Sequence, residues 1–248
     1  MVAVAPAVEL LPVPARGRTF GATHRVRLAD VDPGGRIRLD AIARHLQDVA
    51  SDDAAECGLD GGWVVRRTLI DVRRPAVLGE DLHLTTFCTG TGRSWAERRT
   101  SIVGAAGASI EAVSLWIHVD PASGRPAALG DAFFECYGEA AGDRRVSTRL
   151  ALPAPPPDAD IRPWAVRTVD LDVFDHVNNA SHWPILETVL VRSDADRIGV
   201  AEMEYLVPVD LDTPVDLHTV AADGDAAAWL VAAGRVHTAS RWHVGWIR

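Results

Sequence analysis

The chain has 248 residues, of which 48% are hydrophobic and 24% charged, and its formal net charge is −9. This composition is ordinary for a folded soluble protein, and the length allows one large domain or two of about 100–150 residues. The negative charge argues against a nucleic-acid-binding protein, which usually presents a basic face. All 25 basic residues are arginine, which excludes catalysis through a lysine Schiff base.

The N-terminal residues 1–18 are apolar but interrupted by Pro6, Pro12 and Pro14. They lack the basic n-region of a signal peptide, so we expect a loose arm. No segment approaches the roughly 18–20 consecutive apolar residues that a membrane-spanning helix needs. We therefore expect a cytoplasmic protein with no membrane partner.

The three cysteines are Cys57, Cys88 and Cys136. They form no C-x-x-C pair and no paired framework, which favours a reducing compartment and argues against structural zinc. We expect three free thiols that act as small buried hydrophobic groups.

The first half begins with a short strand-like run at 23–29, followed by the loop DVDPGG at 30–35. A helix is predicted next by apolar residues at i, i+3 and i+4 spacing, namely Leu39, Ile42, Ala43, Leu46, Val49 and Ala50. Gly, Pro and Asp then separate four β-rich runs, at 63–73, 80–90, 94–104 and 108–120.

The second half follows a Pro-rich linker at 151–161, whose composition favours an extended chain. A strand-like run at 162–169 leads into the loop DLDVFDHVNN and then into a second helical pattern, made by Trp183, Leu186, Val189 and Leu190. Four strand candidates close the chain, at 201–209, 214–222, 226–236 and 239–247.

The two halves are an internal repeat. Residues 29–50 align with residues 169–190 without a gap, so that Asp32 matches Asp172, 140 residues later. Each copy reads as a strand, a loop, one long helix and about four antiparallel strands. A constant offset over such a length indicates two copies of one structural unit.

A single helix wrapped by a curled antiparallel sheet buries the apolar faces of both elements. We therefore predict an α+β fold, a tandem hotdog with domains at 19–150 and 162–248. Sheets placed edge to edge would form one continuous sheet and cover the exposed edges.

The second-half loop and the W…LE helix after it resemble the second hotdog domain of acyl-ACP thioesterases. Further fragments follow in that family's order over about residues 20–248, namely RHLQDVA at 44–50, WVVRR at 63–67, RPAVLGEDL at 74–82, RSWAERR at 93–99 and SLWIHVDPASGRP at 114–126. The resemblance implies hydrolysis of a fatty acyl-ACP or acyl-CoA in fatty acid biosynthesis, without a cofactor or a metal.

The resemblance also implies a catalytic loop. Asp172 and His176 fall on two of the family's active-site positions, as general base or nucleophile and as a residue that orients the loop or moves a proton. The family pattern D-x-N-x-H-V-N-N has an asparagine where this chain has Phe174, which would instead narrow the acyl channel. A further family Glu, often Glu-Cys, falls on Pro208 and Val209.

Asn178 and Asn179 stand where the second helix should begin. Unpaired backbone N–H groups at a helix start can stabilise an oxyanion, so these residues would position the thioester, or merely cap the helix. In the first copy, DVDPGG resembles the loop of hydroxybenzoyl-CoA-type thioesterases. That makes Asp32 a secondary catalytic candidate, although Asp-Pro-Gly-Gly is good turn chemistry by itself.

Three further side chains are candidates for substrate binding: Trp63, Gln47 and Glu187. The last two occupy matching places on the two helices, and each could be only a satisfied polar group, just as a tryptophan is commonly core. An acidic carrier protein would dock on a local basic patch, for which the sequence offers Arg66, Arg67, Arg73, Arg74, Arg98 and Arg99.

Two other functions stay open at this stage. Loss of the family residues at Phe174, Pro208 and Val209 fits a non-catalytic acyl-thioester-binding protein. An enoyl-thioester hydratase also pairs Asp with His, but its G-D-x-N-P-x-H-like run is missing from the sequence. Both a monomer and a homodimer are compatible with two hotdogs in one chain.

Overall fold

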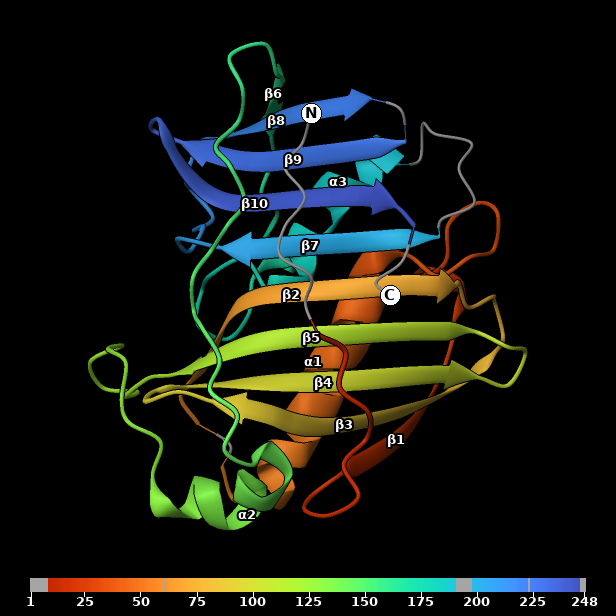
Figure 1. Ribbon diagram of the computed structural model, residues 1–248. Coiled ribbons are helices and arrows are strands. Elements are labelled where there is room, and N and C mark those ends of the chain that lie inside the picture. The colour runs from red at the N-terminus through yellow and green to blue at the C-terminus, as the bar shows by residue number, and fades with distance from the viewer. Residues whose placement is uncertain (1–8, 60, 191–197, 223, 246–248) are drawn as a thin grey trace.

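The computed structural model describes residues 9–59, 61–190, 198–222 and 224–245 (Figure 1). Most of the predicted arm, residues 1–8, lies outside the described residues. Within them, ten strands form one antiparallel sheet in the order β1-β3-β4-β5-β2-β7-β10-β9-β8-β6. No helix in this part of the chain is long and apolar enough to cross a membrane.

The first half contributes five strands and the longest helix. Its elements are β1 (Phe20–Arg25), α1 (Leu39–Glu56), β2 (Trp63–Arg74), β3 (Asp81–Thr91), β4 (Trp95–Gly104), β5 (Ser109–His118) and α2 (Asp131–Ala141). The second half repeats this series with β6 (Asp160–Trp164), α3 (Pro184–Leu190), β7 (Gly199–Tyr205), β8 (Val215–Ala222), β9 (Asp225–Ala232) and β10 (Arg235–Val244). Short 3-10 turns precede the helices, namely η1 (Leu28–Asp30), η2 (Thr168–Asp170) and η3 (Asn179–His182).

The two halves join where β2 pairs with β7. The register runs antiparallel from Arg67 opposite Glu204 to Val72 opposite Gly199. This pairing confirms the tandem hotdog and the continuous sheet expected from the repeat. Because the two central strands are related by an approximate two-fold axis, the helix of each half lies near the other half.

Helices α1 and α3 lie on the same face of the sheet (Figure 1). The apolar stripe of α1 is buried, including Leu39, Ile42 and Val49, and it shares one core with Trp183 and Leu186 of the second half.

The segment between the halves crosses the opposite face of the sheet (Figure 1). Glu204 is buried, and its carboxylate accepts the backbone N–H groups of Ala151 at 2.7 Å and Leu152 at 3.2 Å. Burial raises the pKa of this carboxyl group. The predicted linker at 151–161 is therefore anchored on the sheet, and its last two residues already belong to β6.

The expectation of three free thiols is wrong. Cys57, just after α1, forms a disulfide with Cys136 in α2, and only Cys88 is free among the described residues. Burial raises the pKa of the Cys88 thiol to about 11. The two bonded cysteines are 79 residues apart, and only the docking of α2, which the sequence pattern did not predict, brings them together. The argument for a reducing compartment therefore loses its basis.

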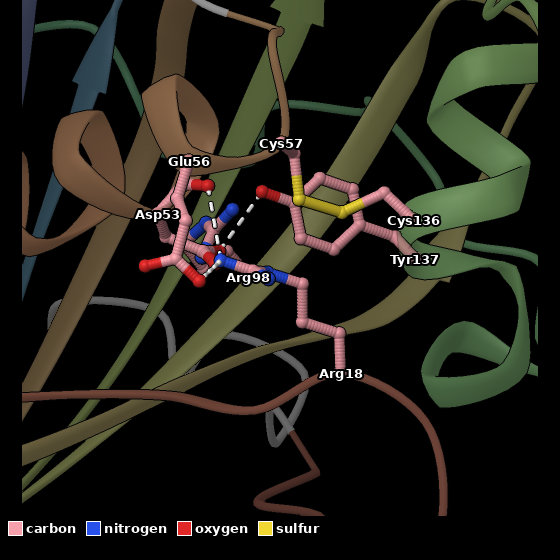
Figure 2. Close-up of a disulfide and its surroundings, with 7 residues drawn as sticks. All are labelled: Arg18, Asp53, Glu56, Cys57, Arg98, Cys136 and Tyr137. Carbon is pink, nitrogen blue, oxygen red and sulfur yellow. Dashed lines mark hydrogen bonds and ion pairs between the residues drawn. A yellow bond between two sulfur atoms is a disulfide. The ribbon is translucent and has the colours of Figure 1, made fainter.

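A buried carboxylate lies beside this disulfide (Figure 2). Asp53 of α1 is fully buried and accepts hydrogen bonds from Arg18 at 2.6 Å, Arg98 at 2.5 Å and the Tyr137 hydroxyl at 2.9 Å. These partners come from the segment before β1, from β4 and from α2. One carboxylate thus ties three elements to the end of α1.

We predict that Asp53→Ala lowers the free energy of unfolding by about 3–5 kcal/mol, because it leaves buried guanidinium groups without their counter-charge. Urea denaturation measures the change. Glu56→Ala is the matched control, since Glu56 is exposed and pairs only with Arg18; it should cost no more than about 1 kcal/mol. Equal losses for the two variants would contradict the role given to Asp53.

Candidate active site

The two loops that precede the helices have the same backbone geometry. Asp32 N–H donates to the Arg36 carbonyl at 2.8 Å, and Asp172 N–H donates to the His176 carbonyl at 2.9 Å. Asp175 adopts a φ of 60°, where the first copy has a glycine at 78°. The offset of 140 residues is thus a repeat in structure as well as in sequence.

Asp172 and His176 lie on the outer part of the second loop. One carboxylate oxygen of Asp172 accepts the Phe174 N–H at 2.9 Å, which makes a local turn. His176 is exposed, and its Nε2 lies 3.6 Å from a carboxylate oxygen of Asp210. Phe174 is 73% exposed, so it does not narrow an acyl channel in this structure.

Asn178 caps the helical turn η3, as the structural interpretation of the Asn-Asn pair expected. Its Oδ1 accepts the Ala180 N–H at 2.9 Å. The Asn179 carbonyl accepts the Tyr205 hydroxyl at 3.1 Å, and this hydroxyl accepts the Trp183 indole N–H at 3.0 Å. The start of the second helix is therefore fixed against β7.

Glu187 closes the corresponding helix start in the first half. This buried carboxylate belongs to α3, yet it accepts the backbone N–H of Leu39, the first residue of α1, at 2.6 Å. An acidic group at a helix N-terminus satisfies an otherwise unpaired donor and opposes the positive end of the helix dipole. Glu187 is thus a cap between the halves.

The repeat places Gln47 where Glu187 stands in the other half, and Asn179 where Leu39 stands. Gln47 does not make the matching contact, because its buried Oε1 has no hydrogen-bond partner in the described part of the chain. The two helix starts are therefore different: Glu187 of the other half caps the first, whereas the neighbouring Asn178 caps the second, and the Gln47 Oε1 has no partner among the described residues. An unpaired buried polar group is uncommon in native proteins and calls for an explanation.

A cavity of about 20 Å³ lies at this open helix start. Its volume corresponds to about one water molecule. Polar groups reach it from both halves, and its walls are Ala43, Leu46, Gln47, Val65, Thr68, Ser114, Trp116, Asn179, Ala180, Trp183 and Tyr205. The buried Nε1 of Trp116 also lacks a partner among the described residues, and the hydroxyls of Thr68 and Ser114 bond each other at 3.1 Å.

This cavity brings together only two of the sequence-predicted site residues, Gln47 and Asn179. Asp32 is buried in the first loop, where it accepts the Arg36 N–H at 3.0 Å. Trp63 packs on α2, with its ring 5.7 Å from that of Phe133. Neither residue lines the cavity.

The predicted arginine patch does not form. Most of these guanidinium groups are at least partly buried and bind protein groups instead. Arg98 pairs with Asp53 and Arg99 with Glu111, whereas Arg66 donates to the Tyr205 carbonyl at 2.7 Å. Arg67 and Arg73 also have carboxylate partners, and only Arg74 is exposed.

The cavity residues that the sequence analysis missed are mainly uncharged. Thr68, Ser114 and Trp116 lie on adjacent strands of the first half, and only the strand register brings them together. Tyr205, the last residue of β7, was missed as well.

Models of known families match both halves. The acyl-ACP thioesterase N-terminal domain matches residues 17–137, and the acyl-ACP thioesterase C-terminal domain matches residues 155–236. The chain belongs to the acyl-ACP thioesterase family. The enzyme class of this family member is accordingly thioester hydrolase.

Individual proteins are also similar to this chain. The thioesterase is similar to an uncharacterized protein of Mycobacterium tuberculosis, with 28% identity over 214 residues that cover 85% of this chain and 86% of the relative. Its fold is similar to that of a putative oleoyl thioesterase from Lactobacillus plantarum, with a TM-score of 0.77 and 19% identity over 94% of this chain and 99% of the other. The fold of a 12:0-ACP thioesterase from Umbellularia californica is similar too, with a TM-score of 0.74 and 21% identity over 93% and 99% of the two chains.

We predict that Glu187→Ala lowers the free energy of unfolding of this thioesterase by about 1–3 kcal/mol, since the Leu39 N–H is left buried without its acceptor. Gln47→Ala, at the matching place in the other half, should cost less because its Oε1 has no partner to leave behind. Chemical denaturation of both variants measures the difference. A larger loss for Gln47→Ala would contradict the asymmetry of the two helix starts.

His182, the last residue of η3, is buried, and its Nδ1 lies 2.8 Å from the Thr238 hydroxyl. Burial lowers the pKa of this imidazole to about 4. Its ordinary pKa of about 6.5 applies in the unfolded chain, so its contribution to stability is present above pH 6.5 and is lost as the pH falls toward 4.

The loss amounts to at most about 3.5 kcal/mol at roughly 1.4 kcal/mol per pKa unit. The free energy of unfolding should therefore fall less steeply between pH 6.5 and 4 in His182→Gln than in the wild type. Urea titrations at several pH values test this. Parallel curves would show that the pKa of His182 is the same in the folded and unfolded states.

Proposed function

We propose that this thioesterase hydrolyses a fatty acyl chain from the phosphopantetheine thiol of acyl carrier protein or coenzyme A. Membership of the acyl-ACP thioesterase family supports this substrate class. The observation that carries the location of the reaction is the open start of the second helix, where Gln47 and Asn179 face a small polar cavity while Glu187 fills the matching place in the first half.

The thioester carbonyl would lie at the start of η3. The Ala180 N–H is already bonded to the Asn178 side chain and the Ser181 N–H to the Asn178 carbonyl. The Asn179 N–H, together with the Gln47 amide, would therefore bind the oxyanion that forms when water attacks the carbonyl carbon. Such donors act without reorganisation, because η3 is held by the Asn178 cap and by Tyr205. The acyl tail would extend between α1 and the sheet, past Leu46 and Val65.

Asp172 is the proposed general base. In contrast with Asp170, which bonds Arg167 at 2.6 Å, Asp172 has no basic side chain as a partner in the described part of the chain. It would accept the proton of the attacking water. Collapse of the tetrahedral intermediate breaks the carbon–sulfur bond, and the thiolate leaves with a proton from Asp172 or His176.

The cavity of about 20 Å³ is too small for a fatty acyl chain. Binding therefore requires the side chains of the cavity wall to move, and the loop at 172–176 to approach the thioester. The exposed positions of Phe174 and His176 leave this loop with little packing to break.

We predict that Asp172→Ala lowers the rate of thiol release by about 10²–10⁴-fold, because general base catalysis contributes an effect of that size. Thiol release is measured with medium and long acyl chains on acyl carrier protein and on coenzyme A. Asp32→Ala changes the same loop position in the first half and serves as the matched control; it should retain most of the activity once folding is verified.

Full turnover by Asp172→Ala would remove this residue from the proposed mechanism. Loss of turnover in Asp32→Ala alone would move the reaction to the first half. Binding of acyl-thioesters without turnover by the wild type would favour the non-catalytic alternative, which the exposed Phe174 at the position of the family asparagine supports.

A further inference from the structure

A second polar cluster lies between β1 and α1, and none of its residues lines the cavity. The strand β1 alternates between half-buried and exposed residues, and His24 shares its half-buried side with Phe20 and Ala22, which pack against the core. On the facing helix, His45 and Asp48 are one turn apart. The cluster thus spans the edge strand of the sheet and the central helix of the first half.

The donor atoms of these three side chains converge. The Nδ1 atoms of His24 and His45 are 2.9 Å apart, with the rings at 71° to each other. One nitrogen from each imidazole and one carboxylate oxygen of Asp48 all lie within 4.8 Å of one another. Two imidazole nitrogens that face each other can share only one proton, whereas a cation between them would use both lone pairs.

The His45 ring carries a second, independent observation. Its Nε2 is buried and has no hydrogen-bond partner among the described residues. Whichever nitrogen carries the proton, the protein leaves one polar atom of this ring unsatisfied. A cation on Nδ1 would fix the ring proton on Nε2, which keeps no acceptor among the described residues, so the ion would set the tautomer of this ring but would not satisfy Nε2.

The fold itself does not require this cluster. The repeat places Trp164, Ile185 and Thr188 at the matching positions of the second half. There Ile185 is fully buried, and the Thr188 hydroxyl accepts a hydrogen bond from Arg162 at 2.9 Å. The same fold therefore accommodates other side chains at these positions, and the His-His-Asp set is particular to the first half.

We propose that His24, His45 and Asp48 form a binding site for a divalent transition-metal ion of the Zn²⁺ type. Two imidazoles and one carboxylate match the ligand preference of Zn²⁺, whereas Mg²⁺ and Ca²⁺ prefer sites made of oxygen alone. Ligands of a tetrahedral ion with bonds of about 2.05 Å lie roughly 3.3 Å apart, so the imidazoles must separate by only a few tenths of an ångström.

The bound ion would join β1 to α1. Because β1 pairs only with β3, at the end of the sheet, a metal bridge would stabilise an edge that otherwise depends on one strand partner. The same helix carries Gln47, two residues after His45. The ion would thus hold the first-half side of the cavity, and this role does not depend on the proposed chemistry at Asp172.

The test is a titration of the full chain, after removal of any affinity tag and treatment with a chelator, with Zn²⁺ in a calorimeter. We expect saturable binding of one ion per chain, an increase in Tm with Zn²⁺ concentration, and no competition from Mg²⁺. Cobalt in place of zinc should give the visible absorption of a four-coordinate site with nitrogen and oxygen ligands.

Asp48→Asn and His24→Ala should each weaken Zn²⁺ binding by about tenfold or more. Asp48 is exposed, so its substitution leaves folding unaffected even if His24→Ala disturbs β1. His83→Ala is the matched control, since His83 is an exposed histidine on β3 that bonds Thr23. Absence of saturable binding to the wild type, or equal binding by Asp48→Asn and the wild type, would overturn the proposal.

Discussion

The antiparallel pairing of β2 with β7 is the constraint on which the rest of the molecule depends. It merges two small sheets into one of ten strands and sets the helices of the two halves side by side on a common core. The start of each helix then meets the helix of the other half. Glu187 reaches Leu39 in one direction, and Gln47 faces Asn179 in the other. A site built from both halves follows directly from this join.

Duplication has allowed the two equivalent places to diverge. The loops before the helices keep the same turn geometry, yet one helix start is closed by a buried carboxylate and the other adjoins a polar cavity. Glu187 caps the first helix, and the proposed function assigns substrate binding to the other copy. The difference between Glu and Gln at one repeated position is thus sufficient to distinguish a structural cap from a candidate active site.

Much of the architecture is predictable from sequence because it rests on local patterns. The strands, the first helix and the repeat are encoded by alternation, helical spacing and a constant offset, and they predicted the joined sheets. Contacts set by tertiary packing were not predictable in this way. The disulfide of Cys57 with Cys136 depends on where α2 docks, and Arg98 and Arg99 were assigned to a docking patch although buried carboxylates neutralise them.

The candidate site was only partly accessible from sequence for the same reason. Gln47 and Asn179, which line the cavity, were candidates from their places in the repeat, whereas Trp116 and Tyr205 reach the cavity through strand register and Asp172 stays a prediction. The most direct test of the account is a crystal structure with a 2-oxoalkyl thioether analogue of the substrate, in which a methylene group between the sulfur and the carbonyl prevents hydrolysis. We predict that the carbonyl lies at the start of η3, beside Gln47 and Asn179. A carbonyl beside Asp32 and Leu39 would contradict the assignment of the reaction to the second half.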